Sequence, residues 1–432
     1  MELKIEKMIY GGDGLARLPV EGSPRPKTVF VPFVLAGEEV SAVLTQEKAG
    51  FNRATAGRII TKSPDRIEPG CQYFYRCGGC HYQHARYEHQ VEIKRAILLE
   101  TLRRQARIDH VGDVHVHPSP PWNYRNRTRL HVALSPDFTL GYYRFNSRDL
   151  LPVGECPISS PLINRAMEEV WRMGRIGPIP VSTEEIEFFV DAEDTELLIE
   201  LYTTYQSDPV EQRTMETFAE SISTALPQVK GITAFVKGST LFPWDTAAWN
   251  WGATELLYKS QHGDYHVQAG SFFQTNRFLI DTLIDAVVAQ SGTLALDLYA
   301  GTGLFSVPLA ARFKNVVAVE PAVASFADLK KNKPANVEAF QLTTEEYLRQ
   351  YGAEAKPDLI VVDPPRAGLD ERVTRALIKM SAPRLTYVSC DPATLARDLR
   401  MLTDVGYRIN GLHLLDMFPQ TFHMETVVHL AK

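Results

Sequence analysis

Two cysteine patterns in this chain could do chemistry, and they differ in kind. Cys390 stands alone after the apolar run RLTYVS, and Pro392 begins a helical pattern two residues later. A thiol at the end of a buried strand lies where open parallel sheets bind ligands. The N-terminus of the following helix is expected to lower the pKa of that thiol. These residues predict a cysteine nucleophile.

The other four cysteines have the spacing of metal ligands. Cys71, Cys77 and Cys80 form Cys-x5-Cys-Gly-Gly-Cys, and Cys156 follows far along the chain in GECP. Four thiolates suit either zinc or an iron–sulfur cluster. A zinc ribbon usually has two Cys-x2-Cys pairs, whereas this chain has one. The three-plus-one arrangement therefore favours a 4Fe–4S cluster, with zinc as the alternative.

A glycine turn follows the first apolar strand of the C-terminal part. Asp297 begins DLYAGTG, in which Gly301 and Gly303 allow a tight turn and a close approach of the backbone to a ligand. Glu320 ends the next strand, where a carboxylate can accept hydrogen bonds from ribose hydroxyls. Ser306 stands where a dinucleotide fingerprint would have its third glycine, and there is no P-loop lysine. These features favour S-adenosylmethionine over NAD, FAD or ATP.

A stretch rich in arginines and aromatic residues extends from Trp122 to Arg148. Arg125, Arg127 and Arg129 lie in its first part, and Tyr and Phe residues are interleaved with the charges. Guanidinium groups bind phosphates, and aromatic rings stack on unpaired bases. The stretch predicts contact with RNA. The alternative is an ordinary sheet with a basic face toward solvent.

The elements that must position these residues fall into three parts. Residues 1–62 alternate apolar and polar residues in short runs, which predicts an OB-like β-barrel. Residues 63–265 predict a β-rich central domain that includes an amphipathic helix over 88–107. Residues 266–432 alternate apolar strands with helices, which predicts an α/β, Rossmann-like domain with a parallel sheet buried on both faces.

Composition and charge exclude several classes of protein. Hydrophobic residues make up 44% of the 432 residues and charged residues 23%, which excludes a disordered chain. No apolar run approaches the ~18 residues of a membrane helix, and the first residues lack a signal-peptide core. A cytoplasmic protein is expected. The net charge of −6 excludes a bulk-basic nucleic-acid binder, so RNA contact requires a local patch.

Taken in order, these motifs resemble those of the RNA uracil-5 methyltransferases, which make 5-methyluridine in ribosomal and transfer RNA. The resemblance covers nearly the whole chain and makes the barrel similar to a TRAM domain. The matching segments are Cys71-x5-CGGC with Cys156, YRNRTR, FFQTN, DLYAGTG, DPPRAGL, SCDPATLARD and DMFPQTFHMET.

The resemblance implies a role for each matching residue. Cys390 is the nucleophile and Glu425 the general base. Gln274, Tyr299, Glu320 and Asp363 surround S-adenosylmethionine, and Asp363 can also touch the target base. The four other cysteines hold the 4Fe–4S cluster, and the helix over 88–107 packs on the catalytic domain. The protein is expected to act as a monomer.

The implied reaction requires both catalytic groups. A thiolate that adds to carbon 6 of uracil makes carbon 5 nucleophilic enough to take the methyl group. Glu425 then removes the proton on carbon 5, and partial burial is expected to raise its pKa for that task. Because the base is unreachable inside a helix, the target uridine must lie in a loop or be flipped out.

The chain also departs from the family pattern. Asp391 stands where Asn is common, and its carboxylate would raise the thiol pKa if it pointed at the sulfur. Phe422 replaces a residue that is usually small or polar. Amino-group methylation and a non-catalytic RNA-binding protein are the competing functions, and Cys390 together with Glu425 argues against both. The choice between ribosomal and transfer RNA stays open, as does the choice of uridine.

Overall fold

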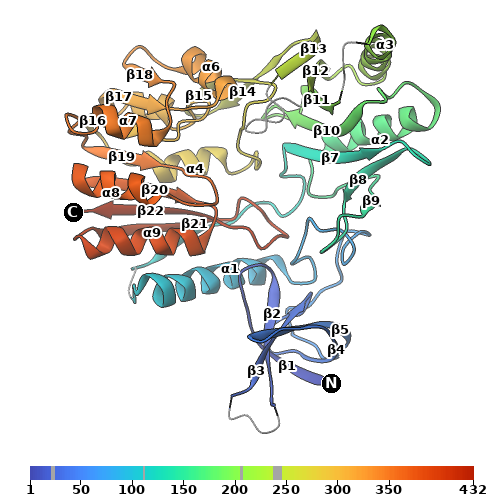
Figure 1. The fold of residues 1–432 in the computed structure, drawn as a ribbon, viewed down its shortest axis with the longest axis horizontal. Helices are drawn as coiled ribbons and strands as arrows, with labels where there is room; N and C mark the ends of the chain where they lie inside the picture. The colour runs from blue at the N-terminus through green and yellow to red at the C-terminus, as the bar shows by residue number, and fades with distance from the viewer. Residues whose placement is uncertain (21–24, 110–111, 205–207, 237–245) are drawn as a thin grey trace.

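The computed structural model describes residues 1–20, 25–109, 112–204, 208–236 and 246–432. Figure 1 shows three parts: a small barrel at the N-terminus, a β-rich part in green, and an α/β part in orange and red that ends at the C-terminus. The α/β fold with a barrel and a β-rich region is the fold that the sequence predicted. None of the helices within these ranges is long and apolar enough to cross a membrane.

The N-terminal strands close into a barrel in the order β1-β2-β3-β5-β4. Alternating residues fill its interior, among them Ile5, Val29, Val31 and Val40. Such alternation buries one side of each strand and leaves the other in water. The strands are β1 (Glu2–Met8), β2 (Asp13–Leu18), β3 (Lys27–Pro32), β4 (Glu39–Glu47) and β5 (Phe51–Thr61).

The central part is a sheet in the order β13-β12-β11-β10-β7-β8-β9. Two amphipathic helices pack on it, α2 (Pro161–Ile176) and α3 (Pro209–Ala225), through a shared apolar cluster. Each begins with a capping side chain followed by proline, which suits the first helical turn. The strands are β7 (Arg127–Ala133), β8 (Thr139–Tyr143), β9 (Leu150–Pro152), β10 (Thr183–Val190), β11 (Leu197–Thr203), β12 (Val229–Val236) and β13 (Thr246–Gly252).

The C-terminal part contains a sheet in the order β18-β17-β16-β19-β20-β22-β21-β6. We call it the catalytic sheet because it carries the predicted catalytic residues. Its neighbours are parallel except around β22, which runs antiparallel to both β20 and β21. The strands are β16 (Gly292–Asp297), β17 (Phe313–Val319), β18 (Val337–Phe340), β19 (Leu359–Val362), β20 (Arg384–Ser389), β21 (Arg408–Leu415), β22 (Glu425–Ala431) and β6 (Val114–His117). Strand β6 lies within the range 63–265 and pairs with β21. The chain therefore adds one strand to this sheet before it forms the central sheet.

Helices cover both faces of the catalytic sheet. One face packs against α4 (Ile280–Val287), α5 (Ser306–Ala310), α6 (Val323–Asn332) and the hairpin of β14 (Glu255–Ser260) and β15 (Gly263–Gln268). The other face packs against α7 (Thr344–Tyr351), α8 (Glu371–Met380) and α9 (Pro392–Asp404). Covering both faces explains why the sheet strands read as continuous apolar runs.

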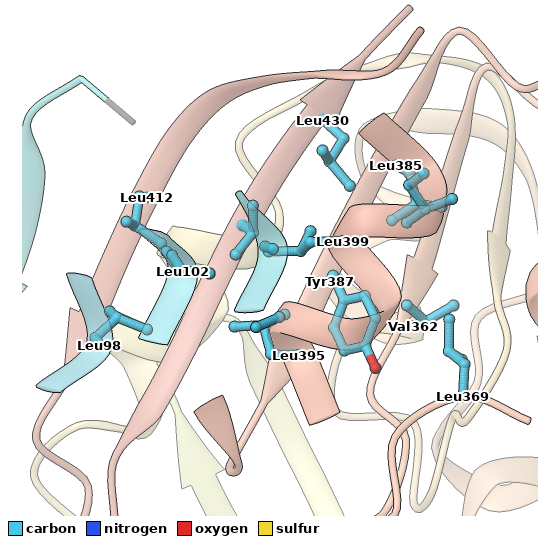
Figure 2. Packing of buried hydrophobic residues seen from close by; sticks show 14 of the residues in the cluster. Leu98, Leu102, Val362, Leu369, Leu385, Tyr387, Leu395, Leu399, Leu412 and Leu430 are labelled. Atoms are coloured by element: carbon cyan, nitrogen blue, oxygen red, sulfur yellow. The ribbon is translucent and has the colours of Figure 1, made fainter. Parts of the chain in front are cut away.

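Helix α1 (Tyr87–Thr101) and the π-helical turn η1 (Leu102–Ala106) lie on the catalytic sheet. Figure 2 shows Leu98 and Leu102 beside Leu395 and Leu399 of α9. The buried ammonium of Lys94 donates to Asp416 at 2.6 Å, which ties α1 to the segment before the last strand. Helix α1 and the turn η1 thus pack against α9 and the sheet. The ends of the three folding units stay predictions.

Candidate active site

Cys390, Asp363 and Glu425 come from three neighbouring strands and meet at one edge of the catalytic sheet. Cys390 follows β20 and Asp363 follows β19, whereas Glu425 begins β22. Because β22 is antiparallel to β20, its first residues lie beside the last residues of β20, and Ser389 pairs with Thr426. The topology therefore brings the predicted nucleophile next to the predicted base.

Negative charge is disfavoured at this edge. Glu425 is 4% exposed, and burial, with repulsion from Asp363, raises the pKa of its carboxyl well above the usual range. Burial also raises the pKa of Asp363 to about 7, with a contribution from Asp297. The raised pKa of Glu425 confirms what the sequence suggested for the base.

The thiol of Cys390 departs from the sequence prediction. Burial, followed by the charges of Glu425 and Asp363, raises its pKa to about 12, while Arg366 acts in the opposite direction. The prediction of a lowered pKa is therefore wrong for the protein without its substrates. That prediction rests on the nearby N-terminus of helix α9, and burial beside two carboxylates outweighs any such effect.

Asp391 has a structural task at the same helix. One oxygen of its side chain accepts hydrogen bonds from the backbone N–H groups of Ala393, at 2.9 Å, and Thr394, at 3.0 Å. It is thus the N-cap of α9. The carboxylate that replaces the family's Asn is directed at amides, which explains how the chain tolerates it.

The glycine turn after β16 forms a cradle that fits S-adenosylmethionine. The carboxylate of Glu320 accepts hydrogen bonds from the N–H of Gly301, at 2.9 Å, and of Ala322, at 2.8 Å. Gly301 has a φ of +55° and leaves open space where a side chain would begin, so a ligand can approach the backbone. Each oxygen of Glu320 keeps a further lone pair for a ribose hydroxyl.

Asp297 adds an unused acceptor to this cradle. Its Oδ2 accepts a hydrogen bond from the hydroxyl of Ser306 at 2.6 Å, whereas its buried Oδ1 has no partner among the described residues. Burial raises the pKa of this carboxyl to about 7. A buried polar atom without a partner is costly, and a bound polar ligand would satisfy it.

The remaining predicted cofactor residues come from two segments of the chain. Gln274 is buried in the loop between β15 and α4. Tyr299 packs against the apolar cluster on the α7–α9 face, and burial raises the pKa of its hydroxyl. Gly303 has a φ of +94° and lies against Leu329, so a larger residue there would be strained.

The four remaining cysteines line one cavity of about 270 Å³ beside the central sheet. All of them are free thiols. Throughout the part of the chain that the structure describes, no group of three or more His, Cys, Asp or Glu side chains is arranged to hold a single metal ion. The sequence segments around Cys71 and Cys156 are thus brought together, and the iron–sulfur cluster stays a prediction.

The three arginines predicted to contact RNA lie in different surroundings. Arg127 is 8% exposed and forms ion pairs with Glu187 and Glu200, the latter at 2.7 Å. This burial does not fit the phosphate contact that the sequence predicted for Arg127. These glutamates lie on β10, which is the neighbour of β7, and on the next strand, β11. The sequence alone does not show that these strands are adjacent.

Arg129 and Arg125 keep some access to solvent. Arg129 pairs with Glu187 and Glu185, and its guanidinium lies 3.8 Å from the centre of the Tyr202 ring. Arg125 donates to the carbonyl of Arg127 at 2.9 Å. Both Arg125 and Arg129 line the cysteine cavity, and their contact with RNA stays a prediction.

We call the edge where Cys390, Asp363 and Glu425 meet the catalytic edge. Sequence reasoning missed three side chains there. Arg366, three residues after Asp363, opposes the rise in the Cys390 pKa and contacts His423 at 3.4 Å. Burial lowers the pKa of His423 to about 3, so its ring is neutral. The hydroxyl of Tyr10, from the barrel, reaches the main chain of Cys390. The DPPR motif could have indicated Arg366, whereas no signal pointed to Tyr10.

Comparisons with known proteins cover almost the whole chain. The family model described as tRNA (Uracil-5-)-methyltransferase matches residues 86–432. A protein named uncharacterized RNA methyltransferase from Aquifex aeolicus is 30% identical over 439 residues, covering 100% of this chain and 98% of that protein. A protein of the same description from Halalkalibacterium halodurans is 31% identical over 456 residues, covering 100% of this chain and 96% of its own.

A solved structure shares the fold. The crystal structure of Pyrococcus abyssi tRNA (uracil-54, C5)-methyltransferase in complex with S-adenosyl-L-homocysteine superposes with a TM-score of 0.74 at 24% identity, over 99% of each chain. At this level of identity the similarity shows the fold. It agrees with the α/β domain, the barrel and the β-rich part described above.

Proposed function

Because the chain belongs to the tRNA (uracil-5-)-methyltransferase family, we propose that it methylates carbon 5 of a specific uridine in structured RNA. The family membership makes it an RNA methyltransferase that uses S-adenosylmethionine. The finer proposal rests on the position of Cys390 beside Glu425, since methylation at carbon 5 needs a nucleophile and a base at one site.

The proposed reaction assigns one task to each group. S-adenosylmethionine, when bound, supplies a methyl group on a positively charged sulfur. The thiolate of Cys390 forms a bond to carbon 6, and the ring electrons then displaced to carbon 5 take the methyl group. Glu425 accepts the proton from carbon 5, and the electrons of that C–H bond expel the thiolate.

Glu425 is suited to this task because it is buried. A carboxyl with a raised pKa is a stronger base once it is ionised, and its burial keeps bulk water away from the proton that it receives. Arg366 favours the thiolate of Cys390 against the neighbouring carboxylates. Asp297, Glu320 and the backbone at Gly301 would hold the cofactor.

The proposed substrate is a flipped-out or loop uridine in ribosomal or transfer RNA. Cys390 is half-buried, so a base still paired in a helix could not reach its sulfur. We also propose that the barrel is a TRAM-like RNA-binding module and that Arg125 and Arg129 contact RNA. Position-resolved mass spectrometry of RNA from a deletion strain would identify the uridine and its RNA class.

A trapping experiment tests the chemistry. The variant Glu425→Gln permits thiolate attack and methyl transfer but cannot remove the proton, so it should accumulate a methylated protein–RNA adduct on denaturing gels. RNA with 5-fluorouridine at the target should trap the unmodified enzyme, because fluorine does not leave as a cation. No adduct should form with Cys390→Ala. If neither probe gives a Cys390-dependent adduct, amino-group methylation becomes the leading reaction.

We further propose that the cysteine cavity holds a 4Fe–4S cluster. Support comes from four thiols, three of them close together in sequence and one distant, that line one cavity. Arg125 and Arg129 also line this cavity. Anaerobically purified protein should contain about four irons per chain. Stoichiometric zinc without iron would overturn this assignment.

A further inference from the structure

The turn between β1 and β2 extends from the barrel to the catalytic edge. The hydroxyl of Tyr10 donates a hydrogen bond to the main-chain carbonyl of Cys390 at 3.3 Å, across 380 positions of sequence. The ring of Tyr10 meets the ring of Phe422 edge-on, with centroids 5.3 Å apart. Tyr10 thus contacts both the nucleophile and the segment that leads into Glu425.

The turn is held in place by its glycines and by His81. Gly11 and Gly12 have φ values of +104° and +91°, which other residues rarely adopt. A side chain on Gly12 would meet the Cβ of His81 at 2.9 Å, so the turn packs directly against that residue. The N–H of His81 donates to the carbonyl of Gln420 at 2.8 Å, which joins this contact to the catalytic domain.

An aromatic contact extends the same connection. The ring centroids of His81 and Phe422 are 4.6 Å apart, and those of Phe422 and His423 are 4.1 Å apart. Edge-to-face and tilted ring contacts of this kind are favourable beyond the burial of the rings. The aromatic Phe422, which departs from the family pattern, is therefore the residue on which the barrel turn packs.

The surroundings of the hydroxyl make it a hydrogen-bond donor. Burial raises the pKa of Tyr10, and the negative charges of Asp391 and Cys390 raise it further, whereas Arg366 lowers it. The phenol is therefore protonated at neutral pH. A neutral donor at this point stabilises one orientation of the chain at the end of β20.

We propose that Tyr10 is a positioning residue for the methylation reaction, one that sets the nucleophile relative to the base. Its hydroxyl holds the main chain at Cys390, and its ring holds Phe422, three residues before Glu425. The proposal rests on the proposed roles of Cys390 and Glu425. It makes the barrel part of the catalytic machinery and not only a module that captures RNA.

Two substitutions separate the hydroxyl from the ring. Tyr10→Phe removes the hydrogen bond and keeps the ring, and we expect kcat to fall about 5–20-fold. Tyr10→Ala removes both contacts, and we expect a fall of about 100-fold or more, the usual cost of misplacing a reacting group by an ångström. The Michaelis constants for RNA and S-adenosylmethionine of Tyr10→Phe should stay within about twofold of the parent.

The rate of adduct formation with 5-fluorouridine RNA should fall with kcat, because the step affected is attack by Cys390. Tyr351→Phe is the matched control, since Tyr351 is 42% exposed on α7 and contacts only the rings of Phe340 and Tyr347 in the described aromatic clusters. Its kcat should be unchanged. Melting temperatures of both phenylalanine variants should equal that of the parent.

Three outcomes would overturn the proposal. Normal kcat and adduct rate in both Tyr10 variants would show that the contact does not position the nucleophile. A loss confined to the Michaelis constant for RNA would make Tyr10 an RNA-binding residue instead. Full methylation by Cys390→Ala in the same assay would remove the proposed function itself. With Cys390→Ala inactive and the Tyr10 variants normal, only the positioning proposal fails.

Discussion

The catalytic edge and the cysteine cavity both bury thiols, yet they surround them differently. Burial raises the pKa of Cys390 to about 12 and that of Cys77 to about 11. The charges closest to Cys390 are the carboxylates of Glu425 and Asp363, opposed by Arg366. Cys77 instead has Cys71 and Cys156 as its negative neighbours, in a cavity that Arg125 and Arg129 also line.

This difference indicates where each region obtains its positive charge. A buried anion is costly unless a cation pairs with it. At the catalytic edge the groups are arranged for a cation that arrives and leaves with each reaction, which the sulfonium of S-adenosylmethionine provides. In the cavity, where four thiols gather with two arginines, the proposed resident cluster would supply it. The predictions below test this distinction.

The largest expected effect is the loss of catalysis in Cys390→Ala. Removing a covalent nucleophile should lower the methylation rate by at least about 10³-fold. Iron content and melting temperature should not change, because this thiol does not line the cavity. Methyl transfer from labelled S-adenosylmethionine, iron analysis and thermal unfolding would measure the three quantities.

The matched variant is Cys156→Ala, for which we expect the opposite pattern. Iron should be lost and the melting temperature should fall by about 5 °C or more, because a cluster joins segments far apart in sequence. The Cys390 adduct with 5-fluorouridine RNA should still form. If both cysteine variants lose iron, or if neither does, the two regions do not have the separate roles proposed here.

A second prediction concerns the buried charges in the sheet next to the cavity. Arg127→Ala leaves buried Glu200 without its cation and Glu187 with Arg129 alone, which should cost about 3–5 kcal/mol of the free energy of unfolding. Arg125→Ala should destabilise much less and should reduce the salt dependence of RNA binding by about one unit of slope. Denaturant unfolding and binding titrations at several salt concentrations would separate the two. A normal stability for Arg127→Ala would contradict the burial argument.

A third prediction follows from the raised pKa of Cys390. Below its pKa a thiol is mostly protonated, so alkylation of Cys390 by iodoacetamide should rise about tenfold per pH unit from pH 7 to 10, without a plateau. S-adenosylmethionine should accelerate this reaction about tenfold relative to S-adenosylhomocysteine, which lacks the positive charge. Peptide mass spectrometry would follow Cys390 itself. A plateau below pH 9 would show that the thiol is already activated.

The smallest expected effect is that of Asp391→Asn. Asparagine caps a helix about as well as aspartate, so helix α9 should keep its stability. The carboxylate of Asp391 faces two backbone N–H groups. Removing its charge should therefore change the alkylation rate of Cys390 by less than about threefold. Glu425→Gln is the contrasting variant, since the charge of Glu425 is the largest contribution after burial that opposes the thiolate, and it should accelerate alkylation at a pH where that carboxyl is ionised. Equal effects of the two substitutions would overturn this assignment.

The sequence by itself determined the features that depend on neighbours in the chain. Apolar runs followed by Asp297, Asp363 and Cys390 put these residues at strand ends, and strand–helix alternation brought those ends to one edge of a parallel sheet. Motif order was sufficient to identify the family. Even the partial burial of Glu425 could be expected from the role of base that the resemblance implies.

Only the tertiary structure decided those pKa shifts, burials and contacts that depend on residues from distant segments. The sign of the pKa shift of Cys390 depends on its burial and on Glu425 and Asp363, which come from two other strands. The burial of Arg127 depends on glutamates 60 and 73 positions away, and the hydroxyl of Tyr10 bonds to the carbonyl of Cys390, 380 positions away. Burial and charge act through space, and a local pattern cannot report which groups the fold brings within a few ångströms.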